Sequence, residues 1–181
     1  MLWKGINMKD VYILAVESSC DDTSIAIVKN GKECIAMSIS SQIDVHNKFG
    51  GVVPEIASRM HCENILYVLE DCLSQTNLKI EDMDAIAVTY KPGLLGSLLV
   101  GLEFAKTVAA VYNKPLIGVN HLIGHIYANN IEDNLEFPLL ALVVSGGHTE
   151  LSIMHNNYEF ELLGTTLDDA IGESFDKVAR V

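Results

Sequence analysis

The sequence predicts an α/β protein in which helices cover a mixed β-sheet. Short β-branched runs joined by tight polar turns open the chain, and segments of helical periodicity then alternate with short apolar runs. The same order starts again in the last quarter of the chain. With 181 residues, of which 49% are hydrophobic, the chain has enough apolar side chains to bury a substantial core.

The first segment is typical of three antiparallel strands. Val11 to Glu17 and Thr23 to Val28 are apolar or β-branched and flank a polar turn at Ser18 to Asp22. Asn30-Gly31 predicts a hairpin turn, because both residues tolerate positive φ, and leads to a third strand at Cys34 to Ser40.

A long amphipathic helix is predicted next, from Pro54 to about Gln75. Proline is favoured in the first turn of a helix, and Glu55 and Arg59 form an i,i+4 pair of opposite charge. The expected apolar face of this helix consists of Cys62, Ile65, Leu66, Leu69, Cys72 and Leu73.

Strands and helices then alternate. Ala85 to Tyr90 is predicted as a short buried strand, and Pro92-Gly93 turns the chain into a helix from Leu95 to about Tyr112. Leu116 to Val119 is a further strand, and His121 to Asn129 begins another helix. Small residues let a neighbouring backbone or a ligand approach the Leu95 helix closely: Gly96, Ser97, Gly101 and Ala105.

The last quarter repeats the order of three strands and a helix. We therefore predict a first unit at residues 10–134 and the beginning of a second, incomplete unit at residues 135–181. The alternative is a single complete domain whose terminal helix is frayed. The repeat is predicted as strands at Pro138 to Ser145, His148 to Met154 and Tyr158 to Leu163, followed by a helix from Leu167 onward.

Composition restricts the function classes. The net charge of −12 argues against a surface that by itself holds a polyanion, so a nucleic-acid substrate requires a local basic patch, further residues or a partner.

Met1 to Asp10 lacks the apolar run of a signal peptide, and Met1 and Met8 are both candidate starts. Leu94 to Leu102 is too short to cross a bilayer, so we expect a cytoplasmic protein. The four cysteines form no CxxC pair and are expected to be reduced, mostly buried thiols.

Two polar hairpin tips are candidate ligand-binding segments, Ser18 to Asp22 and Ser145 to Thr149. Backbone amides in such tips can hold phosphate oxygens, and the carboxylates of Asp21 and Asp22 can orient a metal or a polar group. Each tip alone is equally typical of an ordinary hairpin. The absence of Walker A and GxGxxG sequences argues against a P-loop enzyme and a Rossmann dehydrogenase.

Histidines and carboxylates provide further candidates. His121 and His125 are spaced i,i+4, which places both imidazoles on one helical face, although a metal site needs at least one more ligand. Structural histidines are the alternative for this pair, as they are for His46 and His61. Three carboxylates are expected on one face of the last helix, where the alternative is a solvated surface: Asp169, Glu173 and Asp176.

Six segments carry a resemblance to a known family. They are VESSCDDTSIAIV, HNKFGGVVPEIASRMH, KPGLLGSLLVGLEFAK, NHLIGH, LVVSGGHTEL and DDAIGESFDKVAR, which occur in family order from Val11 onward. In these segments the chain resembles the N-terminal portion of the tRNA threonylcarbamoyladenosine synthase family TsaD (Gcp), formerly described as O-sialoglycoprotein endopeptidase. The resemblance implies the actin-like ATPase (ribonuclease H-like) fold, with two units around a nucleotide cleft and the second unit truncated.

The resemblance also implies a reaction. The threonylcarbamoyl group of threonylcarbamoyl adenylate passes to the exocyclic amine of the adenosine 3′ of the anticodon, and AMP leaves. ATP is the alternative nucleotide. The implied partners are tRNA, a paralogous dimerisation partner (TsaB-like) and a small ATPase (TsaE-like), with no membrane.

The resemblance assigns site residues by position. One divalent metal, iron or zinc, is expected on His121 and His125. Asp21 and Asp22 are the candidate catalytic residues, and Asp22 is shorter than the glutamate that the family often carries there. The third metal ligand of the family lies beyond Val181, so the 181-residue chain alone is expected to be inactive. The expected substrate-binding residues are Val143, Val144, Ser145, Gly146, Gly147 and Asp176.

Three other functions are weighed against this reaction. A non-catalytic paralogue that serves as a dimerisation partner is expected to lose the metal histidines, and both are present. A sugar or acetate kinase of the same superfamily does not need the histidine pair. A metalloprotease is disfavoured, because HLIGH lacks the glutamate base of HExxH.

Overall fold

The computed structural model describes residues 9–179, which form two compact units. The first unit extends to His121 and the second begins at Leu122. The sequence prediction placed a boundary later, after residue 134. Met1 and Met8, the two candidate start residues, lie outside the described residues. The last two residues of the chain also lie outside them.

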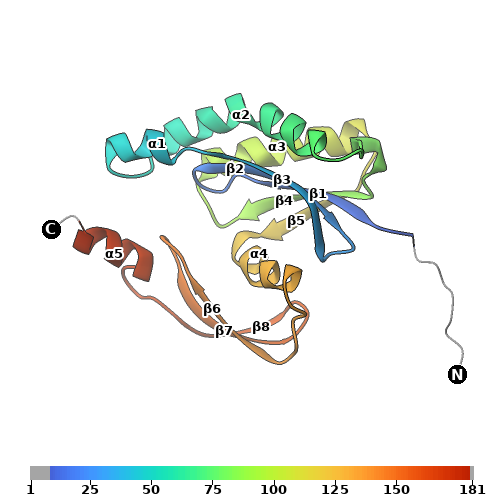
Figure 1. The fold of residues 1–181 in the computed structure, drawn as a ribbon. Helices are drawn as coiled ribbons and strands as arrows, with labels where there is room; N and C mark the ends of the chain where they lie inside the picture. The colour runs from blue at the N-terminus through green and yellow to red at the C-terminus, as the bar shows by residue number, and fades with distance from the viewer. Residues whose placement is uncertain (1–8, 180–181) are drawn as a thin grey trace, which may run out of the picture. The chain divides into compact units, whose positions relative to one another are not determined.

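The first unit contains a five-stranded mixed sheet with the order β3-β2-β1-β4-β5 (Figure 1). Strand β1 pairs antiparallel with β2 and parallel with β4, and β5 adds parallel to β4. The predicted opening of three antiparallel strands and the predicted mixed sheet are both confirmed. The strands are β1 (Tyr12–Glu17), β2 (Asp22–Lys29), β3 (Glu33–Ser41), β4 (Ala85–Lys91) and β5 (Leu116–Asn120).

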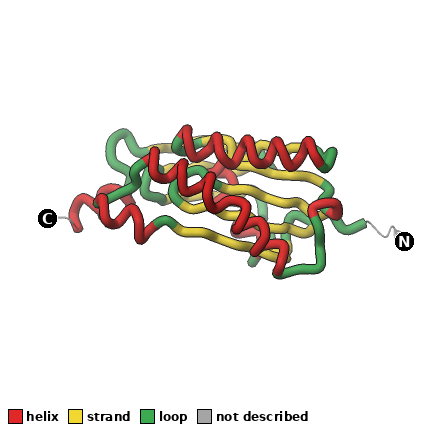
Figure 2. The backbone as a smooth tube through the Cα atoms, turned by 90° about the horizontal axis from the view of Figure 1, so that it is seen from above, coloured by secondary structure: helices red, strands yellow, loops and turns green. Residues whose placement is uncertain are grey.

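Two long helices, α2 (Pro54–Ser74) and α3 (Leu95–Val111), cover the same face of this sheet, as Figure 1 and the view from above in Figure 2 show. Proline lies in the first turn of α2, and Gln75 caps its carboxyl end, as predicted. Shorter helical turns complete the unit: α1 (Ile43–His46), η1 (Asn47–Phe49) and η2 (Ile80–Asp82).

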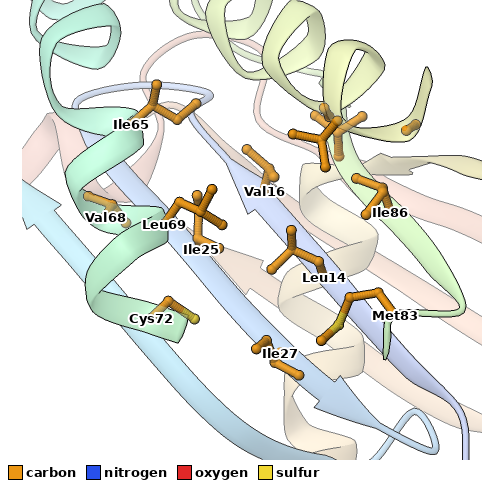
Figure 3. Packing of buried hydrophobic residues seen from close by; sticks show 14 of the residues in the cluster. Leu14, Val16, Ile25, Ile27, Ile65, Val68, Leu69, Cys72, Met83 and Ile86 are labelled. Carbon is orange, nitrogen blue, oxygen red and sulfur yellow. The ribbon is translucent and has the colours of Figure 1, made fainter. Parts of the chain in front are cut away.

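The core of the first unit lies between the sheet and the two helices α2 and α3. Figure 3 shows side chains of α2 directed at the inner face of β1 and β2. The predicted apolar face of α2 was partly wrong, because Leu66 is 58% exposed and Cys62 is also exposed. Both residues lie beyond Leu69, at the edge of the stripe that touches the sheet. The buried residues of α2 are Ala57, His61, Ile65, Val68, Leu69 and Cys72.

Small residues bring α3 close to the first hairpin tip, as the sequence predicted. A Cβ atom added to Gly101 would collide with the hydroxyl of Ser18. Just before α3, a Cβ atom on Gly93 would lie 2.5 Å from the carbonyl oxygen of Ser19. Glycine therefore permits a backbone approach that no other residue allows at these two positions.

The second unit contains a three-stranded antiparallel sheet with the order β6-β7-β8. The order of three antiparallel strands and a helix repeats that of the first unit, as predicted. Strand β6 pairs with β7 alone among the described strands, whereas β1 has a partner on each edge. The elements are α4 (His121–Ala128), η3 (Asn129–Ile131), β6 (Leu139–Val144), β7 (Thr149–Asn156), β8 (Glu159–Thr165) and α5 (Ile171–Ala179).

Helix α5 begins four residues later than the predicted Leu167. The hydroxyl of Thr166 donates a 2.8 Å hydrogen bond to the carbonyl oxygen of Asp169, and the backbone N–H of Ile171 donates a 3.0 Å bond to the hydroxyl of Thr149. Local side-chain bonds of this kind compete with helix formation. They hold residues 166–170 as a loop.

The prediction of mostly buried thiols was wrong. Of the four cysteines, Cys72 is buried, and Cys20, Cys34 and Cys62 are exposed. Apolar neighbours in the sequence do not decide burial, because adjacent residues on a strand or helix face different directions. No helix within residues 9–179 is long and apolar enough to cross a membrane.

Candidate functional site

The carboxyl ends of three parallel strands meet in the first unit. Glu17 ends β1, Thr89 lies near the end of β4, and His121 directly follows β5. Ligands commonly bind at this edge of an open α/β sheet. Here the hydroxyl of Thr89 donates a 2.6 Å hydrogen bond to Oε2 of Glu17, and Nδ1 of His121 lies 3.0 Å from the same oxygen.

Glu17 is the centre of this cluster. The backbone N–H of Ser19 donates to its second oxygen, Oε1. Burial alone would raise the pKa of Glu17, but the hydrogen bonds from His121, Ser19 and Thr89 outweigh it and lower the pKa to about 2. The carboxylate is therefore ionised at neutral pH.

Glu17 was not among the predicted site residues. The signal that was present is a carboxylate at the last position of an otherwise apolar strand, directly before the polar tip. A charged side chain at such a position is seldom without a partner.

The lowered pKa of Glu17 predicts a dependence of stability on pH. In the unfolded chain the carboxyl group takes up a proton near pH 4.5, whereas in the folded chain it stays ionised to about pH 2. Its stabilisation is therefore complete above about pH 4.5 and is lost as the pH falls towards 2. Allowing for solvent screening, we expect roughly 1 to 2 kcal/mol.

Urea unfolding of the metal-free chain at pH 6, 4.5 and 3.5 measures this effect. The difference in unfolding free energy between the wild-type chain and Glu17→Gln should shrink as the pH falls. Glu161→Gln is the matched control, because Glu161 also accepts a hydrogen bond from a histidine, His155, but lies on an exposed strand. A difference for Glu17→Gln that is constant over this range would contradict the prediction.

The first hairpin tip is held by α3. The hydroxyl of Ser18 donates a 2.8 Å bond to the carbonyl oxygen of Ser97, and the hydroxyl of Ser97 donates a 3.1 Å bond to the carbonyl oxygen of Cys20. The N–H of Leu94 donates to the carbonyl oxygen of Ser19 at 2.7 Å. Both ends of the tip are thus fixed to the first turn of α3.

The two predicted catalytic carboxylates lie on this fixed tip. Asp21 is half-buried, and Asp22 is exposed at the start of β2. Partial burial raises the pKa of the neighbouring Cys20 to about 12, with further contributions from Asp21 and Asp22. The Cys20 thiol is therefore protonated at neutral pH and is a poor nucleophile.

His61 and His46 are structural. In His61, Nε2 lies 3.0 Å from the carbonyl oxygen of Cys20, and Nδ1 lies 2.7 Å from the hydroxyl of Thr23. In His46, Nδ1 accepts a hydrogen bond from the N–H of Val53, and Nε2 lies 3.0 Å from Oε1 of Gln42. Both rings are buried with both nitrogens occupied, so neither can hold a ligand.

In the second unit, His125 lies beside the second hairpin tip. A hollow of about 540 Å³ runs along β6. It brings His125 together with three of the predicted substrate-binding residues, Val143, Val144 and Ser145. The other lining residues are Ile126, Asn129, Asn134, Leu135, Glu136, Leu139, Leu140, Ala141 and Leu142.

The second tip is a closed turn. The N–H of Ser145 donates to the carbonyl oxygen of His148 at 2.8 Å, and the N–H of His148 donates to the hydroxyl of Ser145 at 3.1 Å. A Cβ atom added to Gly146 or Gly147 would meet no described atom within 4 Å. The backbone of Gly146 is nevertheless closely packed, because a Cβ atom on Gly172 would lie 2.9 Å from its N and Cα atoms, and neither Gly146 nor Gly147 lines the hollow.

The acidic residues near α5 do not form the predicted single face. Asp169 lies before the helix, because α5 begins only at Ile171. The ammonium group of Lys177 lies 2.5 Å from Asp169 and 3.2 Å from Glu173, so it offsets their repulsion. Asp176 is exposed on α5 and is not among the residues that line the hollow.

The two candidate metal ligands lie one turn apart on α4. Each offers an imidazole, a donor that suits zinc and iron. Within residues 9–179 no group of three or more histidine, cysteine, aspartate or glutamate side chains is placed to hold a metal ion. The donor set therefore fits a metal only as part of a site completed by other ligands.

The sheet order and the repeated strand pattern define the chain as a member of the actin-like ATPase fold. Two solved structures from Pseudomonas aeruginosa share it. YeaZ has a TM-score of 0.55 and 17% identity, over 86% of this chain and 66% of its own. An uncharacterized protein with similarity to peptidase YEAZ has a TM-score of 0.56 and 18% identity, over 85% of this chain and 64% of its own.

The sequence comparisons identify the family. Residues 33–181 match the model of the TsaD family, tRNA N6-adenosine threonylcarbamoyltransferase, and the chain belongs to this family. It is 54% identical over 176 residues to the enzyme of that name from Ligilactobacillus salivarius, and 57% identical over 173 residues to that from Clostridium kluyveri (strain NBRC 12016). These matches cover 97% and 95% of this chain and 51% of each relative, so the chain spans about half their length.

Proposed function

We propose that this chain forms part of the site at which a threonylcarbamoyl group passes from threonylcarbamoyl adenylate to the exocyclic amine of the adenosine 3′ of the anticodon, with release of AMP. The observation that supports this most strongly is the family match over residues 33–181. The position of His125 in one hollow with Val143, Val144 and Ser145 is consistent with it.

His121 and His125 are the proposed ligands of one divalent metal, iron or zinc. When bound, such a metal supplies Lewis-acid polarisation of an acyl or phosphoryl oxygen. Helix α4 presents the two imidazoles with i,i+4 spacing, and Glu17 holds the ring of His121 through Nδ1. The remaining ligands come from outside the described residues.

The second tip and the preceding strand are proposed to bind the activated substrate. Backbone N–H groups of a polar turn such as Ser145 to Thr149 can donate to carbamoyl or phosphate oxygens. Val143 and Val144 supply an apolar wall, and the carboxylate of Asp176 can accept a hydrogen bond from a substrate hydroxyl or amine. The nucleotide is threonylcarbamoyl adenylate, or ATP.

Asp21 and Asp22 are proposed as the catalytic carboxylates. The attacking amine must lose a proton as the new bond to the carbamoyl carbon forms, and a positioned carboxylate can accept it. The fixed tip supplies that positioning, because α3 holds the backbone on both sides through Ser19 and Cys20. The shorter Asp22 reaches less far than a glutamate would.

The proposed partners are tRNA, a paralogous dimerisation partner (TsaB-like) and a small ATPase partner (TsaE-like), all in the cytoplasm. The net charge of −12 supports the need for partners, because a polyanion such as tRNA is held by basic groups. Partner proteins or residues outside this chain must supply most of them.

A chimera tests the proposed function. The matching segment of the Clostridium kluyveri relative is replaced by this chain, and transfer of threonylcarbamoyl to tRNA and release of AMP are measured with purified partners. We expect transfer by the chimera and no turnover by the 181-residue chain alone. A folded chimera without transfer, or an isolated chain that turns over, would contradict the proposal.

A further inference from the structure

The hydrogen bonds of His121 determine which ring nitrogen carries the proton. Nδ1 lies 3.0 Å from Oε2 of Glu17 and 3.2 Å from the hydroxyl of Ser19. An ionised carboxylate only accepts hydrogen bonds, so Nδ1 must be the donor in this contact. In the neutral ring the lone pair then lies on Nε2.

Glu17 cannot readily turn away from His121. Its two oxygens accept hydrogen bonds from the backbone N–H of Ser19 and from the hydroxyl of Thr89. Both donors belong to fixed parts of the unit, the tip bound to α3 and the end of the interior strand β4. The carboxylate is therefore oriented before any ligand binds.

We propose that Glu17 is a positioning residue that keeps His121 in the Nδ1–H tautomer and so directs Nε2 toward the metal. This inference rests on the proposed function, in which His121 is a metal ligand. Histidine ligands generally donate their second ring N–H to a carboxylate or carbonyl oxygen, and loss of that partner typically lowers metal affinity about 10- to 100-fold. A histidine without such a partner has no comparable restraint on tautomer or ring orientation.

The chain contains a natural control pair. His155 and Glu161 also form a histidine–carboxylate contact, at 2.8 Å, but through Nε2 and between exposed positions of β7 and β8. The side chains of His155 and Glu161 are 44% and 59% exposed, against 26% and 34% for His121 and Glu17. A change that reflects only the loss of a carboxylate should appear in both pairs.

The tautomer is measured first, in the metal-free chain. Long-range proton–nitrogen NMR spectra of the imidazole rings distinguish Nδ1–H from Nε2–H. We expect His121 to be Nδ1–H in the wild-type chain and to shift toward Nε2–H in Glu17→Ala. Glu17→Gln keeps the volume of the side chain and should show a smaller shift of the tautomer toward Nε2–H. This variant allows the tautomer to be measured if Glu17→Ala does not fold. Observation of Nε2–H in the wild-type chain would overturn the inference.

Titration of the metal-free chain and its variants with zinc alone gives a second measurement, the zinc affinity. We expect zinc affinity to fall about 10- to 100-fold in Glu17→Ala and to stay unchanged in Glu161→Ala. His121→Ala separates the two proposals. If His121→Ala leaves zinc affinity unchanged, the proposed metal role of His121 is wrong. If it lowers zinc affinity while Glu17→Ala does not, the metal role stands and the positioning role of Glu17 is wrong.

Discussion

Replacing both His121 and His125 by alanine is expected to lower the transfer rate of the chimera by about three orders of magnitude. A metal that polarises the reacting group contributes several kcal/mol to transition-state stabilisation, and each 1.36 kcal/mol corresponds to about tenfold in rate. The two imidazoles are the proposed protein donors on α4, so their joint loss removes the anchor for the metal. Release of AMP in the presence of tRNA, measured with the metal content, checks this.

His155→Ala is the control for this double substitution. It removes an imidazole that bonds to Glu161 on β8, at a position to which no role in transfer is assigned. We expect wild-type transfer and metal content for this variant. Retention of near-normal transfer by the double variant would show that the reaction does not depend on the histidine pair.

Substitution of Gly93 by alanine is expected to lower the free energy of unfolding by about 3 kcal/mol or more. The residue has a φ of 157°, which side chains rarely adopt, and its Cβ atom would lie 2.5 Å from the carbonyl oxygen of Ser19. That oxygen is a backbone atom that accepts the N–H of Leu94, so it cannot move aside without loss of a hydrogen bond. The first tip would then separate from α3.

Gly31→Ala is the matched control for Gly93→Ala. Gly31 also has positive φ, at 67°, but a Cβ atom there would meet no described atom within 4 Å. Only the conformational cost of about 1 to 2 kcal/mol is expected at this turn. Urea unfolding of the two variants measures the difference. Equal losses of stability would mean that the close approach at Ser19 contributes nothing.

The order and boundaries of the elements were largely predictable, because they depend on local properties. Asn30-Gly31 selects a hairpin turn and Pro54 begins a helix whatever the rest of the chain does. The start of α5 was missed because the hydroxyl of Thr149, which is distant in sequence, binds the N–H of Ile171. A contact of that kind leaves no trace in local periodicity.

Burial was predicted less well than secondary structure. Cys62 and Leu66 fit an apolar stripe on α2, yet both are exposed, whereas His61 on the same helix is fully buried. Helical periodicity defines the possible stripes, and the tilt of the helix over the sheet selects one of them. A polar residue can be buried when hydrogen-bond partners are present at the buried face. For His61 these partners are Thr23 and the carbonyl oxygen of Cys20.

The sequence by itself determined the strand and helix order, the repeat, the family and the candidate site residues other than Glu17 and Thr89, because each of these is carried by short contiguous segments. The tertiary structure alone decided that Glu17, Thr89 and His121 meet, since Thr89 and His121 follow Glu17 by 72 and 104 positions. Their meeting follows from the sheet order β1-β4-β5, in which parallel strands end at one edge. Hydrogen bonds between distant strand ends depend on that order, and no local pattern of residues encodes it.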